Sequence, residues 1–553
     1  MDLVVFENNK PYIVDEFREG RFDYLELASD VAETKFFQFL FDQGLIDKLT
    51  RHYPSPRQRH HVPLWMYVSS QLSLRLHGSH SFHSYPLIIR AGGLVDALGP
   101  EVAHREVDPE TGDIRLHCTG FNERNFGPRV TPCDQDFLRK LAKDTDAQKL
   151  EDWYNRHVAS LYGEMKGYDP DGIFIGDGSY LFVPDNEHYE NSMRLLFDEH
   201  NHPVSKDEEQ KMTPAQRKRC QWHRCYRVVF LLHSDRAGER FIVAGVRVLR
   251  ANQAESTALW ELVDTFVGAV GRGVMKILLV DRGFINGPQI GRLKTEYGID
   301  TVIPVRSDMD ILQDVRGVVT LERPWEEYHR ARRYPPPPHK PKHPTAAKRE
   351  RARQKTLTRK RAEEQRNNPP DPHDVLERTL ITKVPQLTSW SACPVPLTGV
   401  YSKDCYADGH EKDWLLVTTN PYWKAAEVRD LYGLRPDIEE RHRQVKCFWD
   451  LTRFHSTAWS LVVSQTVFVA LTYSLLQLHL LQHAHQELNR CTPETTRRLL
   501  PDGDRVMIYR QNYFAFFTLL EHTELMLSLD EKARRKALAK TRRLQKEQAV
   551  HAR

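Results

Sequence analysis

The sequence predicts an α/β protein, and two patterns in the middle of the chain support this prediction. Short apolar runs are typical of buried strands, whereas apolar residues that recur every three or four positions are typical of helices that face a core. From residue 172 three strand-like runs follow one another, and then helices and strands alternate, which predicts a sheet covered by helices. The expected strands are 172–176, 225–232, 239–248, 276–280 and 301–305, and the expected helices are 255–267 and 287–297.

Composition describes a globular chain with an uneven charge distribution. A length of 553 residues allows several domains, and a 40% hydrophobic content excludes a disordered protein. The net charge of +4 does not by itself indicate a nucleic-acid partner, but residues 331–366 hold 13 lysines and arginines against three acidic residues. Eight scattered cysteines without a signal peptide predict reduced thiols and a cytoplasmic protein.

The first 165 residues are expected to be mainly helical. Periodic apolar patterns predict helices at 31–49, 62–76 and 135–162, and the polar stretch 106–125 predicts a loop or a hairpin. The basic side chains of Arg51, Arg57 and Arg59 are candidates for contacts with phosphate groups.

Residues 311–420 form an expected insertion, which contains four consecutive prolines, the basic run and three β-rich segments between 378 and 419. The next stretch, 454–483, has no Asp, Glu, Lys or Arg and is long enough to span a bilayer. Because serine, threonine and glutamine interrupt it, we interpret it as a buried helix rather than a membrane span. After residue 491 we expect a helix over 512–529 and a basic tail that frays.

The strongest functional signal is the motif Tyr432-x2-Arg435-x3-Glu439-x6-Lys446. Glu439 and Lys446 are seven residues apart, so they lie on one face of a helix, and Pro436 suits the first position of that helix. We therefore expect Tyr432 and Arg435 to lie in the turn before it. A carboxylate, a guanidinium, an ammonium and a phenol on one face suit a metal ion and a phosphate.

Two upstream aspartates decide how this motif is interpreted. A charge-rich helix start is usually a solvated face, and the motif alone does not exclude that explanation. Asp177 and Asp281, however, each end a short apolar run, and Asp-Gly or Asp-Arg-Gly follows as an expected turn. Three carboxylates brought together from distant segments favour a site for divalent cations.

Asp177-Gly-Ser, Asp281-Arg-Gly-Phe and the Tyr-Arg-Glu-Lys motif together resemble the DDE transposases of the IS4 superfamily, over residues 172–483. One difference is Pro436, where that family often has a bulky aromatic residue. The resemblance implies a ribonuclease-H-like catalytic core with a β-rich insertion, plus an α-helical N-terminal region that binds transposon ends.

The resemblance also implies a role for each residue of the site. Two Mg²⁺ (or Mn²⁺) ions would cut the ends of a transposon and join its 3′ ends to target DNA. The implied partners are double-stranded DNA, as terminal inverted repeats and target, and a second copy of the chain in a homodimer; no membrane is implied. The implied catalytic and metal-binding residues are Asp177, Asp281 and Glu439, and the implied phosphate-binding residues are Tyr432, Arg435 and Lys446.

Two functions other than transposition stay open. A related ribonuclease-H-like nuclease or domesticated recombinase would use the same three carboxylates, and a DNA-binding regulator without activity would keep the fold.

Five regions follow from these patterns. The expected regions are a DNA-binding N-terminal part (1–165), the first part of the catalytic core (166–310), the insertion (311–420), the second part of the core with Glu439 (421–490) and a helical C-terminal part (491–553).

Overall fold

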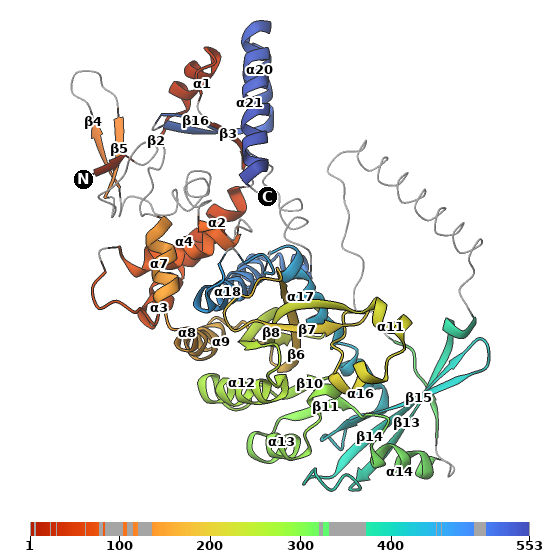
Figure 1. Ribbon diagram of the computed structural model, residues 1–553. Helices are drawn as coiled ribbons and strands as arrows, with labels where there is room; N and C mark the ends of the chain where they lie inside the picture. The colour runs from red at the N-terminus through yellow and green to blue at the C-terminus, as the bar shows by residue number, and fades with distance from the viewer. Residues whose placement is uncertain are drawn as a thin grey trace.

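The structure is a computed structural model, and it has the predicted α/β architecture, with a large mixed sheet between layers of helices (Figure 1). It describes residues 2–4, 7–22, 24–28, 30–60, 62–76, 81–82, 103–107, 114–119, 135–319, 324–330, 372–449, 451–454, 456–490, 505–511 and 513–551. The basic run 331–366 lies outside the described residues.

Five strands form the centre of the sheet, in the order β9-β8-β6-β10-β11. β6, β10 and β11 run parallel, whereas β8 is antiparallel to both β6 and β9. Three antiparallel strands followed by two parallel ones are consistent with the ribonuclease-H-like core that the resemblance implies. The strands are β6 (Ile173–Val183), β8 (Gln221–Ser234), β9 (Phe241–Arg250), β10 (Ile277–Val280) and β11 (Asp300–Pro304).

The prediction that a turn follows Asp177 is wrong. β6 continues through Asp177 to Val183, because its partner β8 is long enough to pair with it from Ile173 to Val183. An Asp-Gly pair favours a turn locally, but pairing with a neighbouring strand outweighs that preference. A further strand, β7 (Met193–Phe197), was not predicted and pairs with the first residues of β8.

Helices cover both faces of the central strands. Ile173 and Ile175 of β6 point into the core that contains α18 (Trp459–Gln482), while Phe174 between them packs in the core of α12 (Glu255–Val270). This alternation is the two-residue period of a strand. Beyond β10, α13 (Gly287–Arg292) continues as a π-helical turn (Leu293–Tyr297) before β11.

α18 supports the interpretation of 454–483 as a buried helix. Among the described residues it is the helix long and apolar enough to cross a membrane, and 94% of its most apolar window is buried inside the protein. It packs against β9 and against the helices α4 (Leu64–Leu76), α7 (Gln135–Asp144) and α8 (Ala147–Trp153). A helix that is apolar all round is expected at such a central position.

The described part of the insertion extends the central sheet. Its strands β13 (Leu376–Leu387), β14 (Leu397–Tyr406) and β15 (Glu411–Thr418) form an antiparallel ladder, and β15 pairs with β11. Figure 1 shows these strands at the end of the sheet away from the N-terminal helices. Before them, α14 (Asp310–Val319) packs on β13.

The N-terminal part is less uniformly helical than predicted. The predicted helix 31–49 is interrupted at Gly44, whose positive φ of 60° suits glycine. The stretch 106–125 contributes to a hairpin of β4 (Ala103–Val107) and β5 (Ile114–Thr119), and β1 (Asp2–Val4) pairs with β5. The helices are α1 (Lys10–Arg18), α2 (Asp30–Asp42), α3 (Leu45–Arg51), α4 (Leu64–Leu76), α7 (Gln135–Asp144), α8 (Ala147–Trp153) and α9 (Ala159–Glu164).

The two ends of the chain share one sheet, which the sequence did not predict. β2 (Glu7–Asn8) and β3 (Tyr24–Ala28) pair with β17 (Tyr513–Thr518) and β16 (Arg505–Arg510), so the prediction of helix from residue 512 is wrong for its first part. Helices α20 (Leu519–Ser528) and α21 (Glu531–His551) follow. Ala537 of α21 is buried in a core shared with α1 and β16, so the first part of the basic tail is packed and not frayed.

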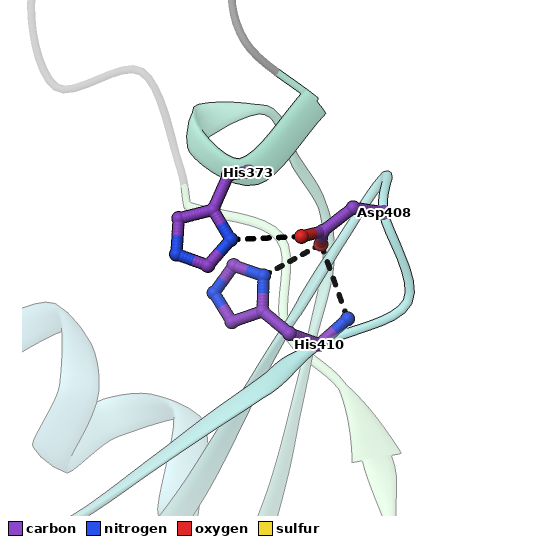
Figure 2. Close-up of side chains that lie close together, drawn as sticks. All are labelled: His373, Asp408 and His410. Carbon is purple, nitrogen blue, oxygen red and sulfur yellow. Dashed lines mark hydrogen bonds and ion pairs between the residues drawn. The ribbon is translucent and has the colours of Figure 1, made fainter.

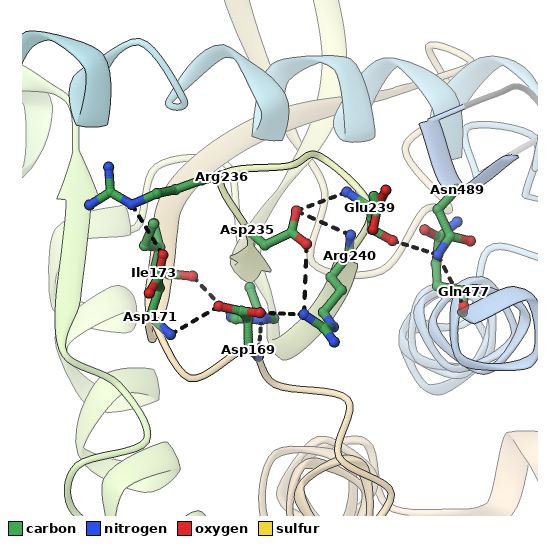
Figure 3. Close-up of polar contacts among 10 residues, drawn as sticks. Asp169, Asp171, Ile173, Asp235, Arg236, Glu239, Arg240, Gln477 and Asn489 are labelled. Carbon is green, nitrogen blue, oxygen red and sulfur yellow. Dashed lines mark hydrogen bonds and ion pairs between the residues drawn. The ribbon is translucent and has the colours of Figure 1, made fainter. Parts of the chain in front are cut away.

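A polar network fixes the start of β6 (Figure 3). Arg240, in the turn between β8 and β9, forms ion pairs with Asp169 and Asp235, and Arg236 donates to Asp171 at 3.1 Å. The amide of Asn489 donates to the backbone carbonyl of Glu239 at 2.7 Å and so ties the same turn to the chain after α18. The residues just before β6, the strand that carries Asp177, are therefore held against the β8–β9 turn.

Candidate active site

Two adjacent parallel strands position the two aspartates. Asp177 lies on the face of β6 that also carries Ile173 and Ile175, because alternate residues of a strand share a face. β10 pairs with β6 so that Val280 lies opposite Gly176, and Asp281 comes directly after Val280. Because the two strands run parallel in this register, Asp281, just past the carboxyl end of β10, lies beside Asp177.

Glu439 comes from the first turn of α17 (Pro436–Cys447), which begins at Pro436 as predicted. Ser234, at the end of β8, donates a hydrogen bond of 2.9 Å to Asp437 in this turn. One turn later His442 stacks on Phe230 of β8, with ring centroids 4.8 Å apart and planes 8° from parallel. These two contacts hold α17 over β8 and fix the direction in which Glu439 projects.

The guanidinium of Arg435 connects all three carboxylates. Its Nη2 atom lies 3.3 Å from Oδ2 of Asp177 and 3.3 Å from Oδ2 of Asp281, and its Nη1 atom forms an ion pair with Glu439. The first two carboxylate oxygens are therefore no further apart than twice 3.3 Å. Segments more than a hundred residues apart in sequence thus converge on one side chain.

The remaining motif residues take different positions. Lys446 donates a hydrogen bond from its ammonium to the hydroxyl of Ser179, on the same face of β6 as Asp177. Tyr432 is the last residue of α16 (Ala425–Tyr432) and packs near Trp414, with ring centroids 6.3 Å apart. Arg435 was predicted to bind phosphate, but in the structure its guanidinium faces the carboxylates.

Burial changes the acidity of the site. It raises the pKa of Asp177 to about 7; Arg435 opposes this rise, and the negative charges of Asp281 and Glu255 add to it. Burial lowers the pKa of the Lys446 ammonium, and nearby Asp177 partly restores it. The pKa of Tyr432 is raised, again chiefly by burial. Perturbed groups gathered in this way are typical of functional sites.

Glu255 is a fourth acidic residue near the site, and the sequence did not reveal it. It is the first residue of α12, and its carboxylate lies where a side chain at Gly178 would be, on the opposite face of β6 from Asp177. It also lies 3.7 Å from Arg227 of β8. The glycine after Asp177 was the available signal, because a strand glycine often marks a close approach.

The donor set fits divalent cations. Carboxylate oxygens are the ligands that Mg²⁺ and Mn²⁺ prefer, and here three carboxylates share one guanidinium, which offsets one of three negative charges. Asp177 is 8% exposed, so water screens its charge poorly. A divalent ion would offset the charge that remains.

The three carboxylates come from the central strand of a mixed sheet, from the next parallel strand and from a later helix. This arrangement is consistent with the class of ribonuclease-H-like enzymes to which DDE transposases belong. A family model described as the transposase DDE domain matches residues 191–475, just over half of the chain. The chain therefore belongs to the DDE transposase family, whose substrate is DNA and whose members use divalent metal ions. The matched range includes Asp281 and Glu439, whereas Asp177 precedes it. Among curated proteins, none matches the sequence.

Proposed function

We propose that this transposase, a member of the IS4 superfamily with the Tyr-Arg-Glu-Lys signature, cuts transposon ends and joins them to target DNA. In the first step water attacks the phosphorus at the transposon end, the bond to the 3′ oxygen breaks, and a 3′-hydroxyl is released. In the second step this hydroxyl attacks a phosphodiester of the target, and a 3′ oxygen of the target leaves. The observation that carries the proposal is the convergence of Asp177, Asp281 and Glu439 on Arg435.

Asp177, Asp281 and Glu439 would hold two Mg²⁺ or Mn²⁺ ions. Bound there, the ions activate the attacking oxygen and neutralise charge on the leaving oxygen. Asp177 would contact both ions, and its position on the central strand beside Asp281 supports this role.

Arg435, Lys446 and Tyr432 would orient the DNA at the scissile phosphate. A guanidinium that neutralises carboxylates is also suited to bind a phosphate once cations take over that neutralisation. The ammonium of Lys446 donates a hydrogen bond to Ser179, on the same strand face as Asp177, which supports a contact between Lys446 and the scissile phosphate. Such contacts fix the register of the DNA without reading its bases.

The partners are the terminal inverted repeats, the target DNA and a second copy of the chain. We assign residues 1–165 and the basic run 331–366 to contacts with DNA phosphates, and we expect a homodimer because both transposon ends are cut together. The protein would act in the cytoplasm, on the DNA of the nucleoid.

The test replaces each carboxylate without changing its shape. Asp177→Asn, Asp281→Asn and Glu439→Gln should each abolish Mg²⁺-dependent nicking of DNA that carries the terminal repeats, while binding of the same DNA in an electrophoretic shift assay persists. Glu440→Gln is the matched control, because Glu440 is next to Glu439 but pairs with Arg443 at 2.7 Å. This control should cut normally.

Three outcomes are informative. Normal cutting by any of the three carboxylate variants would refute the assignment of the site. Cutting without joining, in an assay that supplies target DNA, would identify a nuclease instead. Binding by the unaltered protein with no metal-dependent cutting would identify a regulator.

A further inference from the structure

A second group of ligand-type side chains lies at the far end of the insertion, in strands that the active site does not use. His373 belongs to the short 3₁₀ helix η5 (Pro372–Asp374) just before β13, and Asp408 and His410 lie in the turn between β14 and β15. Figure 2 shows both imidazole rings directed at the two oxygens of one carboxylate. Nδ1 of His373 lies 2.8 Å from Oδ2 of Asp408, and Nδ1 of His410 lies 2.5 Å from Oδ1.

The positions of these side chains are set by the backbone and by ring stacking. The amide of Ala407 donates to the carbonyl of Val375 at 2.9 Å, which joins the turn to the chain after η5. The ring of His410 stacks on His373 at 3.8 Å and on Tyr406 at 4.2 Å. Both imidazoles are therefore held beside Asp408 before any ligand arrives.

We propose that His373, Asp408 and His410 form a site for a divalent transition-metal ion, with Zn²⁺ as the representative ion. One ligand atom from each of the three side chains lies within 4.8 Å of the others, so small side-chain rotations bring them to a common centre. Two imidazoles and one carboxylate are a recurrent zinc ligand set that leaves further positions for water. Imidazole ligands favour zinc and its neighbours, whereas the carboxylates of the active site favour Mg²⁺.

Charge and access also suit an ion. Asp408 lies between both imidazoles, with one carboxylate oxygen beside each ring, so it supplies an anionic oxygen ligand to the set. The side chain of His373 is 64% exposed and that of Asp408 is 31% exposed, so an ion reaches the site from solvent. A bound ion would cross-link the start of β13 to the β14–β15 turn and stabilise this end of the sheet.

The experiment titrates Zn²⁺ alone into the full-length, metal-free protein by calorimetry, with Co²⁺ absorption as a second readout. The background is the Asp281→Asn, Glu439→Gln double variant, in which the active site is weakened as a competing metal site. We expect one Zn²⁺ per chain, and affinity at least about tenfold lower after His373→Gln and His410→Gln. The visible band of bound Co²⁺ should disappear with the same two changes.

The chain offers a matched control in His200 and His202. This surface pair also lies near an acidic residue, since Nδ1 of His202 is 3.4 Å from Oδ2 of Asp198. The two ring centroids, however, are 6.2 Å apart, and the ring planes are inclined by 48°. His200→Gln with His202→Gln should leave Zn²⁺ binding unchanged. Equal Zn²⁺ affinity with and without His373 and His410 would overturn the proposal, and it would leave the DNA-cutting proposal intact because the two sites share no residue.

Discussion

The ammonium of Lys446 donates a hydrogen bond to the hydroxyl of Ser179, which links the end of α17 to the central strand β6. Ser179 and Asp177 lie on the same face of that strand, and Glu439 lies two helical turns before Lys446. The contact therefore fixes the distance between the helix that carries one carboxylate and the strand that carries another.

This contact separates two roles for Lys446. If Lys446 also binds a DNA phosphate, Lys446→Ala should weaken binding of transposon-end DNA and lower the slope of log K against log salt by about 1. Ser179→Ala, which removes only the hydrogen-bond partner, should leave that slope unchanged. Fluorescence anisotropy at several salt concentrations measures both, and an equal slope in the two variants would assign Lys446 to structure alone.

Arg435 should stabilise the metal-free protein. Arg435→Gln leaves Asp177, Asp281 and Glu439 without their common counter-ion, so we expect a loss of about 2 kcal/mol in unfolding free energy without divalent ions. Added Mg²⁺ should raise the melting temperature more in this variant than in the unaltered protein. Calorimetry with EDTA and with Mg²⁺ provides the measurement.

The control for Arg435 lies on α17, the helix that begins directly after it. Arg443→Gln removes an exposed ion pair with Glu440, which is worth about 0.5 kcal/mol, and it should show no special response to Mg²⁺. If both variants respond alike to Mg²⁺, Arg435 does not act as the counter-ion of the metal site.

The raised pKa of Asp177 predicts how stability depends on pH. Its pKa is about 7 in the folded state against an ordinary value near 3.8, so the folded state holds the proton more tightly than the unfolded state. The resulting stabilisation is present below the unfolded pKa and is lost as pH rises through about 7. Metal-free protein should therefore lose stability between about pH 4 and pH 7 relative to Asp177→Asn, which cannot titrate.

The same titration controls the affinity for cations. A proton on Asp177 competes with a divalent ion, so Mg²⁺ affinity should fall as pH decreases below about 7. Calorimetric titration of Mg²⁺ at several pH values tests this, and an affinity that is constant across this range would contradict a metal-binding role for Asp177.

Gly178 should be sensitive to substitution because of Glu255. A methyl group at Gly178 would meet the Glu255 carboxylate, which must then move from its position near Arg227, so Gly178→Ala should cost about 1 kcal/mol in stability. Combining it with Glu255→Ala should recover part of that loss, since the obstructing side chain is then removed. Urea denaturation measures each variant.

Gly268, in the same helix as Glu255, is the matched control for this steric argument. A methyl group there meets nothing within 4 Å, so Gly268→Ala should be neutral or should stabilise the protein by up to about 1 kcal/mol. No recovery in the Gly178→Ala, Glu255→Ala double variant would show that the two positions act separately.

The sequence by itself determined several elements of the central sheet and the candidate residues. The spacing of apolar residues and the turn residues between them predicted β8, β9, β10 and α12, and Pro436 predicted the start of α17. These features could be predicted because they depend only on a few neighbouring residues. The spacing within the Tyr-Arg-Glu-Lys motif likewise required no partner outside its own segment.

Only the tertiary structure decided which side chains meet. Pairing with β8 carried β6 through Asp177, and the convergence of three carboxylates drew the guanidinium of Arg435 toward them. Glu255 became a neighbour of the site only because α12 packs against a glycine of β6. Strand pairing, burial and charge compensation act between residues far apart in the chain. The periodicity of a single segment therefore cannot predict these contacts.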